Sequence, residues 1–252
     1  MKRPIPQGLL VAVEGIDGAG KTSIATLLAQ WCGERGLSCT ISKEPTGLKW
    51  GTELRNSARA GRLPLEREIE LFLLDRKDHV ARSIEPALRE WNIVILDRYY
   101  WSSAAYQGGR GANYDEIIAA NEAFAPKPDL VLVLDLDVDA GLGRIRMRGD
   151  RPNLFEGKAG LRRARQIFQQ LAEKNSNALL IDTSGHFKDS FNIALKAFQK
   201  AAVQKIASSA MSCVEMANFT LTFFGGEQVA DELPDATPEM NALLAEAKKA
   251  SL

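Results

Sequence analysis

The chain has 252 residues, of which 45% are hydrophobic and 25% charged, and its 32 basic side chains balance its 32 acidic ones. This balance excludes an overall charge that would favour nucleic acid or a membrane surface. The apolar run Leu9 to Val13 is too short for a signal peptide or a membrane span, and three cysteines without a Cys-x-x-Cys pair are typical of a reducing compartment. We therefore expect a cytoplasmic protein with one main domain.

Short apolar runs alternate with segments of helical spacing along most of the chain. Strands are predicted at 9–13, 38–42, 93–96, 130–134 and 178–181, and the helical segments include 21–36, 66–91 and 161–175. Strands that alternate with helices pair in parallel through right-handed crossovers. The sequence therefore predicts an α/β fold with a doubly wound, parallel five-stranded sheet flanked by helices, and ligands at the carboxyl ends of its strands.

The pattern changes after about residue 205. Residues 206–252 contain one strand-like segment, "FTLTFF", then a Gly-Gly turn and a final helix that is predicted to start at Thr237. We expect a main domain over 1–205 and a C-terminal extension over 206–252, to which the sequence assigns no role.

A phosphate-binding motif lies between the first strand and the first helix. Residues 15–22 read "GIDGAGKT" and match G-x-x-x-x-G-K-[ST] in the context that the motif requires. The glycines let backbone N–H groups surround an anion, Lys21 reaches the outer phosphates, and the Thr22 hydroxyl is a ligand for Mg²⁺. The motif predicts a nucleoside triphosphate site, although GTPases, motor ATPases and kinases all share it. The candidate residues are Gly15, Ile16, Asp17, Gly18, Ala19, Gly20, Lys21, Thr22 and Ser23.

Asp97 and Arg98 directly follow the buried strand at 93–96, which places them at the ligand edge of the sheet. A carboxylate there can hold Mg²⁺ or its waters, and a guanidinium can bind a phosphate through two parallel hydrogen bonds. Taken alone, however, this dipeptide favours a solvated salt bridge at the end of a strand.

Phe72 and Arg76 are four residues apart and therefore share one face of a helix. An aromatic ring beside a fork of donors can stack on a nucleobase and bind its edge. The alternative, which the pair by itself favours, places Phe72 in the apolar stripe with Ile69 and Leu73 and pairs Arg76 with an acidic residue on the surface.

Arg144, Arg148 and Arg151 follow helical spacing on a segment that should end near Pro152. A basic face of this kind can close over a triphosphate and neutralise charge during phosphoryl transfer. The alternative is a solvated charged face, which we expect for Arg146 on the other side.

In chain order, "EGIDGAGKTS", "EPTG", "LFLLDRKDH", "LDRYYWSSAAYQGG", "PDLVLVLD" and "GLGRIRMRGDR" resemble thymidylate kinase, a P-loop nucleoside monophosphate kinase. The resemblance covers about residues 8 to 200. It implies transfer of the γ-phosphate of ATP to dTMP, giving dTDP and ADP, as a step in dTTP biosynthesis. It also implies Mg²⁺ as cofactor, ATP and dTMP as small-molecule partners, a homodimer, and neither nucleic acid nor membrane as partner.

The resemblance also assigns roles to single residues. Lys21 and Thr22 match the residues at the ATP phosphates and the metal, Asp97 lies near the metal, and Asp17 contacts the dTMP sugar and the reacting region. Arg98 matches the arginine at the dTMP phosphate. The predicted dTMP site comprises Asp17, Glu44, Pro45, Phe72 under the base, Arg76 at its carbonyl edge, Arg98, Ser103, Tyr106 against the sugar, and Gln107.

Members of this family differ in where the catalytic arginine lies, either in the phosphate loop or in a lid. Here Gly18 and Ala19 stand in the loop, so the resemblance assigns the arginine to a lid over about 143–160, with Arg151 as first choice and Arg148 as second. The predicted catalytic residues are Lys21, Arg98, Arg151, Asp17 and Arg148. Beyond Arg151, "PNLFEGKAG" departs from the usual acidic continuation, and this leaves no clear role for Glu156.

Two other classes of function remain open at this point. The first is a P-loop kinase for a nucleoside or another monophosphate, which the Phe72/Arg76 pair and the "DRY" segment disfavour. The second is a nucleotide-dependent switch, which is disfavoured because the chain contains no N-K-x-D motif. His79 and His186 are expected to make structural hydrogen bonds and to take no part in the chemistry.

Overall fold

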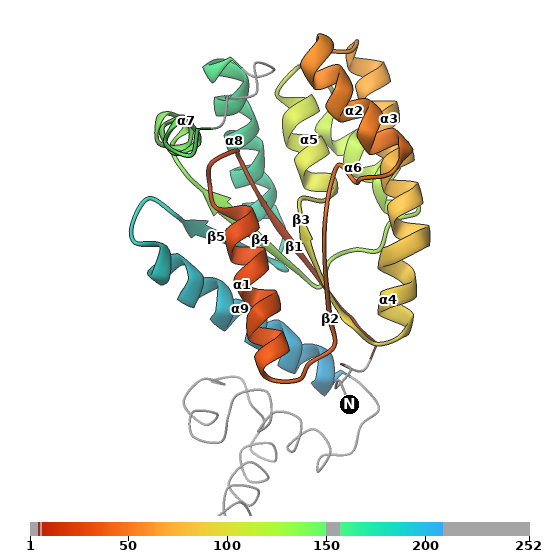
Figure 1. Cartoon of the computed structure of the whole chain (residues 1–252), viewed down its shortest axis with the longest axis vertical. Coiled ribbons are helices and arrows are strands. Elements are labelled where there is room, and N and C mark those ends of the chain that lie inside the picture. The colour runs from red at the N-terminus through yellow and green to blue at the C-terminus, as the bar shows by residue number, and fades with distance from the viewer. Residues whose placement is uncertain (1–4, 6, 150–156, 209–252) are drawn as a thin grey trace, which may run out of the picture.

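The computed structural model describes residues 5, 7–149 and 157–208, and these form a five-stranded sheet in the order β2-β3-β1-β4-β5 (Figure 1). All four pairings between neighbouring strands are parallel. The strands are β1 Leu9–Gly15, β2 Cys39–Lys43, β3 Ile93–Asp97, β4 Leu130–Asp135 and β5 Ala178–Asp182. The predicted doubly wound sheet is thus confirmed.

The three central strands form the core of the sheet. Every residue of β1 and β3 is buried, whereas the edge strands β2 and β5 are only partly covered. Central strands of a parallel sheet are covered by helices on both faces, so their sequences are continuous apolar runs. The weaker apolar pattern at 38–42 is explained by the place of β2 at the edge.

Helices cover both faces of this sheet. Helices α1 and α9 pack on one face, and α5 and α8 pack on the other (Figure 1). Within the described residues, no helix is long and apolar enough to cross a membrane. The helices are α1 Lys21–Glu34, α2 Lys49–Ala60, α3 Leu65–His79, the π-helical turn η1 Val80–Ile84, α4 Glu85–Arg89, α5 Tyr100–Gly108, α6 Tyr114–Glu122, α7 Val138–Met147, α8 Lys158–Lys174 and α9 Phe187–Ala207.

The helix that carries the candidate lid arginines is shorter than predicted. It was expected to end near Pro152, but α7 ends at Met147, and Gly149 adopts a φ of 78° that terminates it. The predicted lid over 143–160 therefore includes the end of α7 and the start of α8. Arg151, Glu156 and Pro152 lie outside the described residues, as do the strand and helix predicted within 209–252. Helix α9 runs two residues past the predicted boundary at 205.

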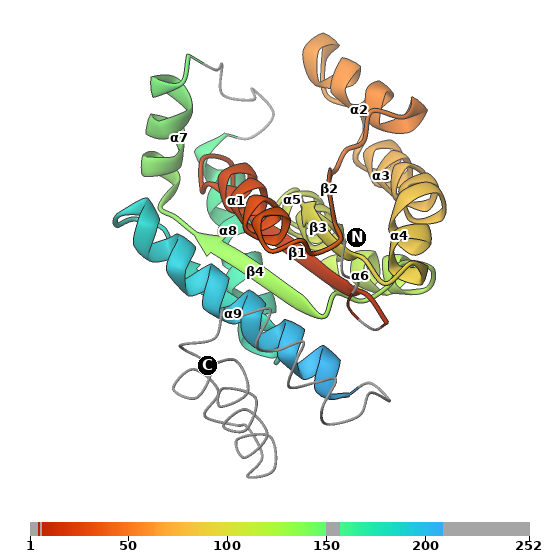
Figure 2. The ribbon, with the colours of Figure 1, turned by 60° about the horizontal axis from the view of Figure 1, so that its bottom comes forward.

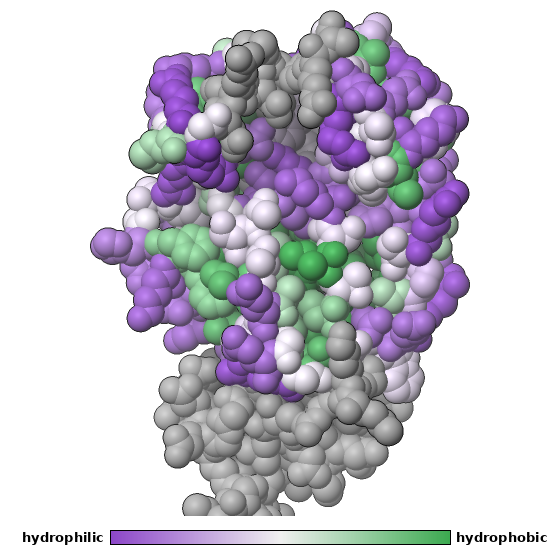
Figure 3. Space-filling view, viewed as in Figure 1, coloured by the Kyte–Doolittle hydropathy of each residue, from purple (hydrophilic) through white to green (hydrophobic). Residues whose placement is uncertain are grey.

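The carboxyl ends of the strands all point to one end of the molecule. Around this end, α7 lies on one side and α2 and α3 on the other (Figure 2). In the space-filling view, hydrophilic residues gather around a hollow at the same end, whereas apolar residues are concentrated lower on the face shown (Figure 3). The candidate site residues are found here, as expected for an open α/β sheet.

Candidate functional site

The phosphate loop connects β1 to α1 and turns its lysine inward. The Lys21 ammonium donates a hydrogen bond of 2.7 Å to the carbonyl oxygen of Ile16 and lies 3.9 Å from Asp17 Oδ1. Burial lowers the pKa of Lys21 to about 7, and the positive charge of Arg98 adds to this effect. A triphosphate in the loop would add negative charge beside the buried ammonium and so favour its protonated form.

Gly18 of the phosphate loop packs directly against the backbone of α7. A Cβ at Gly18 would lie 2.4 Å from the carbonyl oxygen of Gly141, and Gly18 has a φ of 85°. In return, a Cβ at Gly141 would lie 2.7 Å from the carbonyl oxygen of Asp17. No side chain fits at position 18, so this loop has no room there for an arginine.

The end of β3 places Asp97 and Arg98 beside the phosphate loop. Arg98 adopts a φ of 75°, a backbone conformation that is uncommon for residues other than glycine and is often found at functional sites. Its guanidinium donates to Asp17 Oδ1 and, over 3.3 Å, to Ser102 Oγ. The salt bridge that the dipeptide alone favoured is present, because Asp97 pairs with the exposed Lys43, but the side chain of Asp97 is only 4% exposed and is not solvated.

Glu14, which the sequence pattern did not single out, holds the backbone that follows Arg98 in place. Its fully buried carboxylate accepts hydrogen bonds from the backbone N–H groups of Tyr99 and Ser102 and from the Ser102 hydroxyl. Burial raises the pKa of Glu14 to about 7, although these hydrogen bonds and the charge of Arg98 oppose the shift. Glu14 thus fixes the turn that positions Arg98.

Thr22 and Asp97 provide oxygen ligands of the kind that Mg²⁺ prefers. The Thr22 hydroxyl donates to Asp97 Oδ2, and the Lys43 ammonium lies 3.3 Å from the same oxygen. The other oxygen, Asp97 Oδ1, is buried and has no hydrogen-bond partner among the residues that the structure describes. A buried carboxylate oxygen without a partner, next to a hydroxyl and a phosphate loop, fits a hydrated Mg²⁺ ion.

A cavity of about 590 Å³ opens beside Arg98, between the phosphate loop, α2, α3 and α5. It brings together most of the residues that the resemblance assigned to the dTMP site. Those that line it are Asp17, Glu44, Pro45, Phe72, Arg76, Arg98, Tyr106 and Gln107. Ser103 does not line it but accepts a hydrogen bond of 3.2 Å from Arg76 Nη2.

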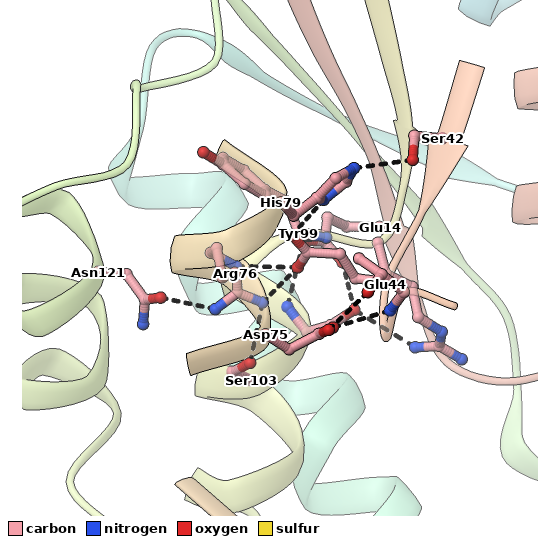
Figure 4. A network of polar contacts seen from close by, with 12 residues as sticks. Glu14, Ser42, Glu44, Asp75, Arg76, His79, Tyr99, Ser103 and Asn121 are labelled. Carbon is pink, nitrogen blue, oxygen red and sulfur yellow. Dashed lines mark hydrogen bonds and ion pairs between the residues drawn. The ribbon is translucent and has the colours of Figure 1, made fainter. Parts of the chain in front are cut away.

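Arg76 is the centre of a buried polar network on one wall of the cavity (Figure 4). Its Nε donates to Glu44 Oε2 over 2.8 Å, and its Nη1 donates to Asn121 Oδ1 over 2.6 Å. The second Glu44 oxygen lies 2.9 Å from Nδ1 of His79, whose Nε2 lies 2.7 Å from the Ser42 hydroxyl. Arg76 is 1% exposed, so the alternative of a surface ion pair is wrong. His79 makes the structural hydrogen bonds expected of it.

The comparison with known families agrees with this geometry. The model of the thymidylate kinase family, described as "Thymidylate kinase", matches residues 13–192. The chain belongs to the thymidylate kinase family. It is 54% identical over 166 residues to a thymidylate kinase of Xanthomonas campestris pv. campestris (strain B100), covering 66% of this chain and 73% of the relative.

Two further relatives extend the match. A thymidylate kinase of Xylella fastidiosa (strain M12) is 47% identical over 191 residues, which cover 76% of this chain and 87% of the relative. The crystal structure of thymidylate kinase from Ehrlichia chaffeensis has a TM-score of 0.61 and 27% sequence identity, and it covers 77% of this chain and 98% of that one. These two matches cover 76% and 77% of this chain and 87% and 98% of the relatives.

Arg144 and Arg148 have different surroundings in this member of the thymidylate kinase family. Arg144 Nη2 donates over 2.6 Å to the carbonyl oxygen of Thr183, just after β5. Arg148 is the exposed residue that caps the helix. The structure therefore places Arg144 against the segment that follows β5 and Arg148 at the end of α7, and Arg151 lies outside the described residues.

Several residues that line the cavity were not predicted from the sequence. Glu68 and Arg62 are among them, and Glu68 lies one helical turn before Phe72 on α3. Extending the Phe72/Arg76 spacing backward by four residues would have found Glu68. No local pattern indicates the others, because separate segments bring them to the cavity: Lys43, Leu54, Arg55, Ser57, Tyr99 and Ser102.

Proposed function

We propose that this site holds ATP at the phosphate loop and dTMP in the neighbouring cavity, with Arg98 on the acceptor phosphate. Membership of the thymidylate kinase family makes the chain an enzyme that phosphorylates dTMP to dTDP with ATP as donor. The observation that carries the assignment is the position of Asp17. Its Oδ1 is the oxygen that Lys21 and Arg98 share, so the donor lysine and the acceptor arginine meet at one carboxylate.

The charges of Lys21 and Arg98 suit the chemistry of this transfer. The donor and acceptor phosphates repel each other, and a loose transition state leaves little for a general base to do. Rate acceleration then comes from positioning the two substrates and from cations around the transferring group. Lys21, Arg98 and a lid arginine supply those cations, with Arg151 as first choice and Arg148 as second. In the free site, the Asp17 carboxylate offsets the mutual repulsion of Lys21 and Arg98.

Arg76 and Gln107 match the edge of a thymine base. Arg76 offers N–H donors, and Gln107 has a buried Oε1 without a hydrogen-bond partner in the described part of the chain. Thymine presents an acceptor at O4 and a donor at N3–H, whereas cytosine presents a donor at N4 and an acceptor at N3. Phe72 would stack on the base and Tyr106 would contact the sugar. This arrangement favours dTMP over dCMP.

Thr22 and Asp97 would hold Mg²⁺, with Asp97 acting partly through water. When bound, the ion would neutralise phosphate charge and orient the triphosphate. Asp97→Asn keeps the shape of this side chain but removes its charge, so the ion should bind more weakly to the complex with ATP. Titration with Mn²⁺ followed by electron paramagnetic resonance would measure that loss directly.

The resemblance also leads us to propose a homodimer in the cytoplasm. Sedimentation equilibrium at micromolar concentration should give twice the monomer mass. A monomer at that concentration would contradict the proposal.

Arg98→Ala tests the acceptor assignment. Removal of a charged hydrogen-bonding partner of the dTMP phosphate should weaken dTMP binding and slow turnover together, with ATP binding kept. The measurements are calorimetric titration with dTMP and with a non-hydrolysable ATP analogue, alongside steady-state kinetics. Unchanged dTMP affinity in a folded variant would remove Arg98 from this role.

A coupled assay for ADP with dTMP, dUMP, dCMP, AMP and GMP as acceptors would test the choice of substrate. A preferred acceptor other than dTMP would contradict the proposed function.

A further inference from the structure

Glu68 occupies the same face of α3 as Phe72 and Arg76. The three residues follow each other at intervals of four, and all three line the cavity. The side chain of Glu68 is only 12% exposed. A carboxylate held this close to a site for an anionic substrate calls for a specific role, because it would otherwise repel the substrate.

Three side chains hold the Glu68 carboxylate in place. Arg110 Nη1 donates to Oε2 over 2.8 Å, and Arg62 donates to both oxygens over 3.3 and 3.4 Å. Gln107 Nε2 donates to Oε1 over 2.8 Å. Arg110 comes just after α5 and Arg62 lies between α2 and α3, so Glu68 ties three segments together around the cavity.

The contact with Gln107 sets the direction of its amide. A carboxylate bonded by two guanidinium groups accepts hydrogen bonds and has none to donate, so the Nε2 end of Gln107 must face it. The Oε1 end is then directed away from Glu68. This is the buried oxygen that has no partner within the described residues. Leaving such an acceptor unpaired is unfavourable, and a ligand N–H would relieve the cost.

We infer that Glu68 is a positioning residue for substrate specificity, which selects a base with an N–H donor by holding Gln107 in its accepting orientation. The inference rests on the proposed function of the cavity as the dTMP site and deepens it. Glu68 itself does not touch the base. It prevents the Gln107 amide from rotating by half a turn, which would present Nε2 and thus suit the N3 acceptor of cytosine.

Glu68→Gln is the decisive variant because it keeps the size of the side chain. The amide at position 68 can donate as well as accept, so Gln107 becomes free to adopt either orientation. The ratio of kcat/KM for dTMP to that for dCMP should fall by about tenfold, the effect of one buried hydrogen bond. Arg76 still opposes the cytosine amino group, so dTMP stays the better substrate.

Glu70→Gln is the matched control. Glu70 is on the same helix, is 58% exposed at its side chain and pairs only with Arg67 in the described structure. The Glu70→Gln variant should leave the ratio of kcat/KM for dTMP to that for dCMP unchanged. Arg110→Gln removes one support of Glu68 but keeps the carboxylate that faces Gln107, so it should lower Tm and keep the ratio. A ratio that falls equally in Arg110→Gln, or that stays unchanged in a folded Glu68→Gln, would overturn the inference.

A substrate analogue separates this inference from the proposed function. The 5′-monophosphate of N3-methylthymidine lacks the N3–H donor. If the wild type phosphorylates it as well as dTMP, the assignment of Gln107 to the base edge fails. If the analogue is rejected but Glu68→Gln keeps its discrimination against dCMP, only the role of Glu68 fails.

A measurement on the wild-type protein does not depend on how the variants fold. In NMR spectra, the side-chain N–H protons of Gln107 should exchange with solvent more slowly than those of the exposed Gln30, because one of them is bonded to Glu68. Exchange as fast as that of Gln30 would overturn the inference.

Discussion

The donor side and the acceptor side of the site differ in the kind of contact that shapes them. On the donor side, the backbone of the phosphate loop packs closely against the backbone of α7, at Gly18 and Gly141. On the acceptor side, the cavity is shaped by interlocked side chains, with Arg76 held by Glu44 and Asn121. A backbone contact cannot move aside for an added atom, whereas a side-chain network can keep its geometry through a replacement of equal size. The donor half should therefore tolerate fewer substitutions than the acceptor half.

The largest effect is expected for the lid arginine on the donor side. Arg151→Ala should slow phosphoryl transfer by about 10³-fold, as for other catalytic arginines, with little change in dTMP binding. Single-turnover kinetics would measure the transfer step, with Arg148→Ala as the comparison. If transfer is unchanged in Arg151→Ala and lost in Arg148→Ala, the second choice is the catalytic residue.

Gly141→Ala tests the backbone contact on the donor side. The new Cβ would meet the carbonyl oxygen of Asp17 at 2.7 Å, so the loop must shift, and a misplacement of about 1 Å costs about 10²-fold in rate. Gly143→Ala on the same helix is the control, since a Cβ there meets no described atom within 4 Å.

Both replacements raise helix propensity, so neither should lower Tm through α7 itself. Activity lost only in Gly141→Ala, in a variant that is still folded, would support the contact. Equal activity in the two variants would contradict the claim that the backbone contact makes the donor side less tolerant of substitution.

Glu44→Gln tests the acceptor network. It leaves the buried Arg76 without its carboxylate, and breaking a buried pair in this way costs about 3 kcal/mol of unfolding free energy. The affinity for dTMP should fall less than in Arg98→Ala, because Asn121 and Ser103 still hold the guanidinium. Urea unfolding and calorimetric titration measure the two effects. A variant as stable as the wild type would show that the network does not support the cavity.

The smallest effect is a dependence on pH that belongs to the donor side. The pKa of Lys21 is about 7 in the free protein, and triphosphate charges would raise it. Above pH 7, ATP must therefore bind together with a proton, and its affinity should fall by at most about tenfold for each pH unit. Calorimetry at pH 8 in buffers of different ionisation enthalpy would detect the uptake of this proton. Binding of dTMP under the same conditions is the control, and no uptake with ATP would contradict the low pKa.

Local pattern predicted the donor side better than the acceptor side. The phosphate loop is one continuous motif, so Lys21 and Thr22 could be assigned from their neighbours in the chain. In contrast, the segment with Arg76 by itself favoured a surface ion pair over a base-binding site, because its buried partner Glu44 is 32 residues away in the sequence. Glu14 was missed for the same reason: its partners follow β3, a different strand.

By itself, the sequence determined how strands and helices alternate along the chain. It also determined the phosphate loop and, through its ordered motifs, the family. These depend on residues close together in the chain, whose spacing sets which faces are buried. Only the tertiary structure decided that position 18 has no space for a side chain, that Arg76 is buried, and that Glu68 faces Gln107. Each of these depends on which distant segments pack together, and that packing is settled by the whole fold.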